Sequence, residues 1–128
     1  MKIKSVSNYM AILRNLNNVL KADVSQYHID LICAALTDPT AISRSKQYPF
    51  RYYSAYKTLQ ENREQYDSTK VSAVLQALEK AIAISAESVP KISGKSLVLV
   101  DVSGSMCWQP ISKHSKVTPA EVAGMFGA

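Results

Sequence analysis

The chain of 128 residues has few cysteines and no long apolar run. Its two cysteines, Cys33 and Cys107, show no CxxC or Cys/His spacing, so the sequence signals neither a disulfide framework nor a zinc site, and we expect two reduced thiols. Every apolar run is far shorter than the roughly 18 residues that a membrane span needs. The N-terminal stretch "MKIKSVSNYM" also lacks the apolar core of a signal peptide. We therefore expect a cytoplasmic protein with no membrane partner.

The motifs of nucleophilic catalysis are missing as well. The sequence contains no G-x-S-x-G elbow, and the surroundings of His28 and His114 indicate no Ser-His-Asp arrangement. We expect a protein that is not an enzyme and has no catalytic residues.

Acidic residues are scarce in the first half of the chain. Residues 1–60 hold eight Lys/Arg against three Asp/Glu, whereas residues 61–128 hold seven of each. The whole net charge of +5 therefore comes from the N-terminal half, where it favours a partner that carries phosphates.

Apolar residues recur at helical spacing in four segments between residues 8 and 85. We expect helices over residues 8–21 with Ser7 as N-cap, from Ser25 to just before Pro39, from Pro49 through Leu59, and from about Lys70 to Ser85, with a short turn at 38–45. The first 87 residues are thus expected to be nearly all helical.

The composition changes at "ESVPKISGK", which indicates a boundary between modules. A strand from Ser96 to Val100, apolar on both faces, should follow, and then a helix that opens with a capping box of Thr118 and Glu121. One strand cannot build a parallel sheet. The expected fold is therefore mainly α, with a helical module at 1–88 and, at 89–128, the incomplete start of an α/β domain, so that the chain is a fragment or truncated product.

The stretch "VLVDVSGSMCW" stops an apolar run on Asp101, with Ser103 and Ser105 spaced behind it. One carboxylate and two hydroxyls at the carboxyl end of a strand are hard oxygen ligands of the kind that suit Mg²⁺ or Mn²⁺. The alternative is that these side chains only cap the following turn. We expect divalent-cation binding by this chain to be weak or absent.

A second stretch, "RSKQYPFRYYSAYK" at 44–57, holds four of the fifteen basic residues, five of the ten aromatic ones and no acid. Interleaved cations and rings suit single-stranded RNA. On a helix that starts at Pro49, however, Tyr52, Tyr53 and Tyr56 share a face with Leu59 and fit a hydrophobic core better than a stacking surface. The RNA-binding candidates, chosen by charge, are Arg44, Lys46, Arg51 and Lys57.

Four segments together, "AILRNLNNVL", "YPFRYYSAYKTL", "VLQALEKAI" and "GKSLVLVDVSGSM", resemble in order and spacing the TROVE-module proteins, the Ro autoantigen family. The resemblance implies a ring of HEAT-like helical repeats closed by a von Willebrand factor A domain. It also implies that the ring binds small noncoding Y RNAs and the single-stranded ends of misfolded RNAs. It makes residues 1–88 the C-terminal part of the helical module and 89–128 the start of the A domain. It also matches Asp101, Ser103 and Ser105 to the metal-ion-dependent adhesion site, in which the aspartate commonly acts through water and later loops supply further ligands.

The leading hypothesis from the sequence is a Ro-type ribonucleoprotein component that binds a small noncoding RNA. The alternative is a metal-dependent protein-binding module, in which the A-type domain recruits a protein partner and the helices serve as scaffold. A third hypothesis is an inactive remnant.

Overall fold

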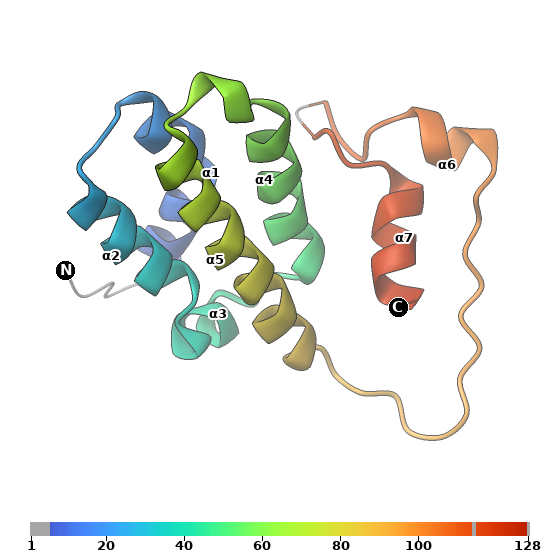
Figure 1. The fold of residues 1–128 in the computed structure, drawn as a ribbon. Coiled ribbons are helices and arrows are strands. Elements are labelled where there is room, and N and C mark those ends of the chain that lie inside the picture. The colour runs from blue at the N-terminus through green and yellow to red at the C-terminus, as the bar shows by residue number, and fades with distance from the viewer. Residues whose placement is uncertain (1–5, 114, 128) are drawn as a thin grey trace. The chain divides into compact units, whose positions relative to one another are not determined.

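The computed structural model describes residues 6–113 and 115–127, which fall into two compact units, 1–88 and 89–128. The described part of the first unit consists of helices joined by short loops (Figure 1), as the sequence predicts. Its elements are α1 (Val6–Lys21), α2 (Gln26–Leu36), α3 (Pro39–Ser45), α4 (Pro49–Glu61), the short 3₁₀ helix η1 (Arg63–Gln65) and α5 (Ser68–Glu87). Among the described helices of the chain, none is long and apolar enough to cross a membrane.

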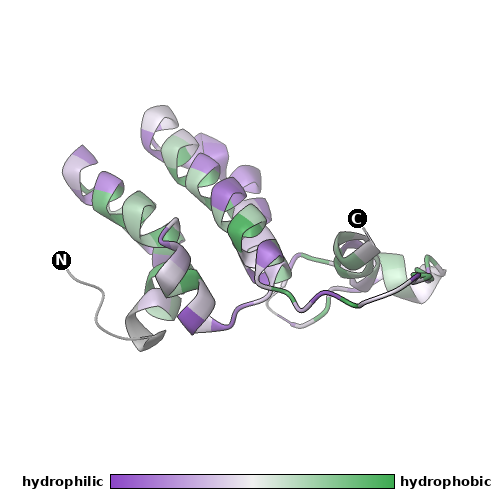
Figure 2. Cartoon of the chain, turned by 90° about the horizontal axis from the view of Figure 1, so that it is seen from below, coloured by the Kyte–Doolittle hydropathy of each residue, from purple (hydrophilic) through white to green (hydrophobic). Residues whose placement is uncertain are grey.

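The core of the helical unit forms around α5, which packs against α2, α3 and α4. Helix α1 packs against the same three helices. The helices of this unit that are visible in Figure 2 carry both hydrophilic and hydrophobic residues, as amphipathic helices do. The apolar residues that are buried here share helical spacing: Tyr9, Leu13, Leu16, Leu20, Ile29, Leu36, Ile42, Tyr52, Leu59, Val71, Val74, Leu75, Ala77, Leu78 and Ala81. They include Tyr52 and Leu59, which the sequence analysis places on the inward face of the helix from Pro49.

The start of α1 and the segment 38–45 differ from prediction. Helix α1 begins at Val6, so Ser7 lies inside the helix and the prediction that it is the N-cap is wrong. The segment predicted as a turn is helix α3: Asp38 caps it by accepting a hydrogen bond from the Thr40 N–H (2.9 Å), and Pro39 occupies its first position. Seven residues are too few to show a helical period, but Asp-Pro is itself a helix-start signal.

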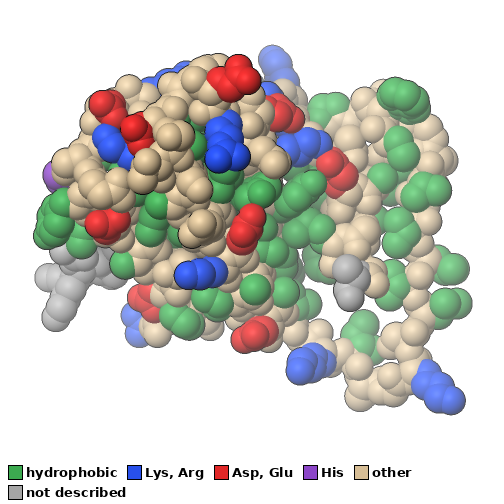
Figure 3. Space-filling view, in the orientation of Figure 1, with side chains coloured by type: hydrophobic (Ala, Val, Ile, Leu, Met, Phe, Trp, Pro, Cys, Tyr) green, Lys and Arg blue, Asp and Glu red, His purple; other side chains and the backbone are tan. Residues whose placement is uncertain are grey.

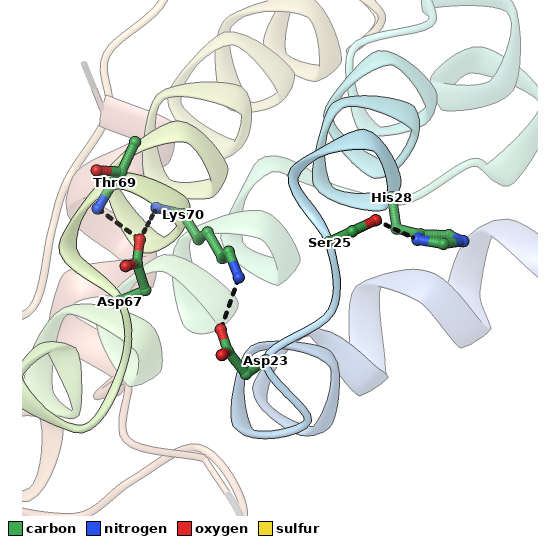
Figure 4. A network of polar contacts seen from close by, with 6 residues as sticks. All are labelled: Asp23, Ser25, His28, Asp67, Thr69 and Lys70. Carbon is green, nitrogen blue, oxygen red and sulfur yellow. Dashed lines mark hydrogen bonds and ion pairs between the residues drawn. The ribbon is translucent and has the colours of Figure 1, made fainter.

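Helix α5 has a similar cap, and an ion pair joins its first turn to the loop between α1 and α2 (Figure 4). The Asp67 carboxylate accepts from the N–H groups of Thr69 (3.0 Å) and Lys70 (2.9 Å). The ammonium of Lys70 in turn lies 2.6 Å from the carboxylate of Asp23. The cap satisfies two amide groups that have no partner within the helix, so it explains why α5 begins two residues before the predicted position.

Two buried tyrosines connect the first four helices. The Tyr9 hydroxyl of α1 donates to the carbonyl of Leu36 at the end of α2 (3.0 Å). The rings of Tyr9 and Tyr52 of α4 meet edge to face with centroids 6.3 Å apart, and the Tyr52 hydroxyl lies 3.4 Å from that of Ser45 in α3. Burial, followed by the interaction with Tyr52, raises the pKa of Tyr9.

In the second unit, residues 89–102 run without regular secondary structure, and α6 (Gly104–Trp108) and α7 (Pro119–Gly127) follow. The strand predicted at 96–100 is not formed: the structure shows no strand anywhere in the described part of the chain. A strand is defined by hydrogen bonds to a neighbouring strand, and this segment has none beside it. Helix α6, a five-residue helix directly after the Asp101 motif, is not among the predicted helices.

The last predicted helix is confirmed together with its cap. The Glu121 carboxylate accepts from the Thr118 N–H (2.8 Å), and the Thr118 hydroxyl lies 3.3 Å from the Glu121 N–H, which is the reciprocal pairing of a capping box. At the other end of α7, Gly127 lies close to Val98 and Val100 of the irregular segment.

Candidate nucleic-acid interface

The basic segment 44–57 spans the junction between α3 and α4. Arg44 lies in the last turn of α3, and Lys46 is its C-cap in the left-handed conformation (φ 50°). Arg51 lies in the first turn of α4, and all three of these side chains are exposed. Lys57 lies further along α4 and is half-buried. The fold therefore presents three of the four predicted RNA-binding cations at one helix junction.

The tyrosines of this segment divide between core and surface. Tyr52 is fully buried, as the helical spacing predicts, and Tyr53 and Tyr56 are half-buried. A hydrogen bond to Glu79 of α5 raises the pKa of Tyr56, so its hydroxyl connects α4 to α5. The rings of Tyr52 and Tyr56 are therefore part of the packing between helices.

Tyr48 differs from these tyrosines and is not among the RNA-binding candidates chosen by charge. Its side chain is 54% exposed, and its ring stacks on that of Phe50 with centroids 6.3 Å apart and planes at 13°. The Arg51 guanidinium lies over the same Phe50 ring, 5.4 Å from its centroid. The signal that was available is Pro49: a residue before a helix-starting proline lies outside the helix and does not follow its buried stripe.

The surroundings of these residues are not uniformly positive. On the face of the helical unit shown in Figure 3, Lys and Arg side chains alternate with Asp and Glu side chains. An electrostatic interface must therefore be local. The segment 44–57 combines four cations and five aromatic residues with no acid.

The three candidate metal ligands lie in the second unit, at the start of α6. The Asp101 carboxylate accepts from the Ser103 N–H (2.8 Å), and the hydroxyls of Ser103 and Ser105 are 3.3 Å apart. The hydrogen bond from the Ser103 backbone lowers the pKa of Asp101, which keeps the carboxylate charged. All three side chains are exposed, and Ser103 occupies the N-cap position of α6.

This geometry fits both interpretations of the motif. The Asp101–Ser103 bond is a local turn contact, while the three oxygen-bearing side chains are also brought to one place. No cluster of three His, Cys, Asp or Glu side chains suited to a metal occurs among residues 6–113 and 115–127. A cation here would depend on one carboxylate and two hydroxyls, a set that suits Mg²⁺ or Mn²⁺ with several retained waters.

Of the two histidines, the structure describes His28. The His28 ring is exposed, and its Nδ1 lies 2.8 Å from the Ser25 hydroxyl at the start of α2 (Figure 4). Ser25 has the extended backbone of an N-cap, but its hydroxyl makes this contact instead of a bond to a backbone amide. His114 lies outside the described residues. Cys33 and Cys107 are both free thiols.

A family model described as the TROVE domain matches residues 4–90. The chain belongs to the TROVE domain family. The match contains the whole basic segment 44–57 and ends before the Asp101 motif, so the family assignment applies to the helical unit. No solved structure matches this TROVE domain chain.

Curated relatives of the TROVE chain include two mammalian proteins. It is 37% identical over 51 residues to "Telomerase protein component 1" of Rattus norvegicus and 35% identical over 51 residues to the protein of the same name from Mus musculus. Each alignment covers 40% of this chain and 2% of the relative, so the chain spans only a small part of these proteins.

Proposed function

We propose that this TROVE domain chain binds noncoding RNA that is single-stranded or structured, through the junction between α3 and α4, and catalyses no reaction. The observation that carries the proposal is the set of exposed cations at this junction, Arg44, Lys46 and Arg51, in a segment without an acidic residue. Lys and Arg side chains displace the counterions that surround phosphates, and this release supplies most of the sequence-independent affinity for nucleic acid.

Membership of the TROVE family supports the same partner. The resemblance to Ro-type proteins makes a small noncoding RNA, of the Y RNA or misfolded class, the RNA that we propose. It also makes the helical unit a segment of HEAT-like repeats within a TROVE module.

A salt titration of RNA affinity tests this proposal. Changing Arg44, Lys46, Arg51 and Lys57 together to Gln should weaken binding of a labelled single-stranded RNA. Each lost phosphate contact should lower the slope of log affinity against log salt by about 0.7. Circular dichroism should show unchanged helix content, because none of these four side chains belongs to the buried core.

A matched control removes four positive charges elsewhere. Lys80, Lys91, Lys95 and Lys113 are exposed and lie outside the basic segment, so changing them to Gln lowers the net charge by the same amount. We expect the control to keep most of the affinity and slope. If the two quadruple variants bind RNA equally well, the segment 44–57 is an ordinary solvated surface and the proposal is wrong.

A second function is favoured by a separate observation, the proximity of Asp101, Ser103 and Ser105. We propose as the alternative that residues 89–128 are the start of a von Willebrand A-type domain, which binds a protein partner through a divalent cation. Exposed apolar side chains support this alternative: Leu97 and Leu99 are 84% and 85% exposed, as expected of a segment that would become a buried strand only within a sheet.

A further inference from the structure

The aromatic residues at the α3–α4 junction are arranged differently from the other rings of the helical unit. Tyr48 is more than half exposed, yet its ring is held nearly parallel to Phe50, and the guanidinium of Arg51 covers Phe50 as well. Three planar groups, two rings and one guanidinium, therefore lie together at the surface.

The backbone holds this arrangement in place. Tyr48 has an extended backbone (φ −76°, ψ 154°), as residues before proline do, and Pro49 fixes the next φ angle and begins α4. Phe50 and Arg51 follow within the first helical turn, so their side chains start from a regular backbone. A ring that is ordered in advance loses little conformational entropy when a ligand stacks on it.

We propose that Tyr48, supported by Phe50 and Arg51, is a stacking platform for an unpaired base of single-stranded RNA. This inference rests on the proposed function and adds a recognition element to it, because charge alone attracts any nucleic acid whereas a stacking surface selects bases that are not paired.

Charge beside the platform favours RNA over an uncharged aromatic ligand. Lys46 precedes Tyr48 by two residues, so their Cα atoms are at most about 7 Å apart. Arg44 precedes Tyr48 by four residues, within about 14 Å. Both cations are exposed, and no acid lies in this segment. A base on Tyr48 would therefore have its phosphates beside positive side chains.

Another exposed tyrosine shows what the platform requires. Tyr27 on α2 is 67% exposed, but its ring meets His28 edge to face, with planes at 76°, and α2 contains no Lys or Arg. Tyr27 and Tyr48 are thus both exposed, but of the two, Tyr48 has the parallel Phe50 ring and the neighbouring cations. This makes Tyr27 the matched control.

The experiment measures fluorescence anisotropy of the full chain with a labelled oligouridylate of about 12 nucleotides. The second probe has the same phosphates but abasic sugars. Stacking of one base contributes about 1–3 kcal/mol, so Tyr48→Ala should weaken binding of oligouridylate roughly 5- to 150-fold. Tyr48→Phe should bind like the parent protein, and so should Tyr27→Ala.

The abasic probe isolates the base. The parent protein and Tyr48→Ala should bind it equally, and Tyr48→Ala should keep the parent salt slope on both probes because it removes no charge. If Tyr48→Ala loses helix content by circular dichroism, Tyr48→Leu replaces it: leucine keeps apolar volume without a π-face, and it should also lose affinity for oligouridylate only.

The outcomes separate this inference from the proposed function. If the parent protein binds oligouridylate with the expected salt dependence and the Tyr48 variants bind equally well, the platform is wrong and the electrostatic interface stands. The platform is also wrong if Tyr48→Ala weakens binding of the abasic probe as much as that of oligouridylate. If the parent protein binds neither probe at low salt, both proposals fail.

Discussion

Removal of one hydroxyl group from Tyr9 should destabilise the helical unit measurably. Tyr9 is 1% exposed, and its hydroxyl donates at 3.0 Å to the carbonyl of Leu36, which is fully buried. This carbonyl belongs to the last turn of α2, where carbonyls have no partner within the helix. Tyr9→Phe keeps the ring and its edge-to-face contact with the Tyr52 ring but leaves a buried acceptor unsatisfied.

The expected loss is the desolvation penalty of that carbonyl, about 1–3 kcal/mol of unfolding free energy. For a domain of this size, each kcal/mol lowers the melting temperature by about 4–8 °C. Thermal unfolding followed by circular dichroism at 222 nm, a standard helix wavelength, measures the shift. Tyr27→Phe is the control, because this exposed ring should change stability by no more than about 0.5 kcal/mol.

Equal melting temperatures for the two variants would refute the reasoning. That result would mean that the Leu36 carbonyl finds water or another donor once the hydroxyl is gone, so the bond would not be a structural link between α1 and α2. A loss in Tyr9→Phe much larger than the stated range would point instead to a wider rearrangement around Tyr52.

Two further predictions concern ionisation and metal binding. Because the pKa of Tyr9 is raised in the folded state, the unfolded chain loses this proton first above about pH 10, and the unfolding free energy should fall by up to about 1.4 kcal/mol per pH unit there. Urea unfolding above about pH 10 should show that the unfolding free energy falls less steeply with pH for Tyr9→Phe than for the parent protein. Equal slopes for the two proteins would contradict the raised pKa of Tyr9. Calorimetry with Mg²⁺ or Mn²⁺ should detect at most weak binding, which Asp101→Ala should abolish and Glu87→Gln should not. Tight binding that survives Asp101→Ala would show that the cation does not bind at Asp101.

The sequence alone was sufficient for four helices of the first unit, α1, α2, α4 and α5, and for most of its core. Apolar residues at helical spacing indicate which face each helix buries, and this pattern is local, so Tyr52 and Leu59 could be placed inward without knowledge of their partners. The capping box of α7 was readable for the same reason, since both of its partners lie within four residues.

The candidate site was only partly readable. The four cations follow from composition, but the sequence could not distinguish the exposed Arg51 from the half-buried Lys57 on the same helix. The platform at Tyr48 was missed because the aromatic residues were judged by helical spacing, and Tyr48 precedes the helix to which that spacing applies.

Only the tertiary structure shows the contacts between segments that are distant in the sequence. The hydrogen bond from Tyr9 to Leu36 joins residues of α1 and α2, and the ion pair of Lys70 joins α5 to a loop 47 residues away. The segment 96–100 also depends on a distant partner. Its residues favour a strand, but a strand exists only when another backbone supplies hydrogen bonds. Helical hydrogen bonds close within four residues and can be predicted locally, whereas pairing between segments depends on where the rest of the chain lies.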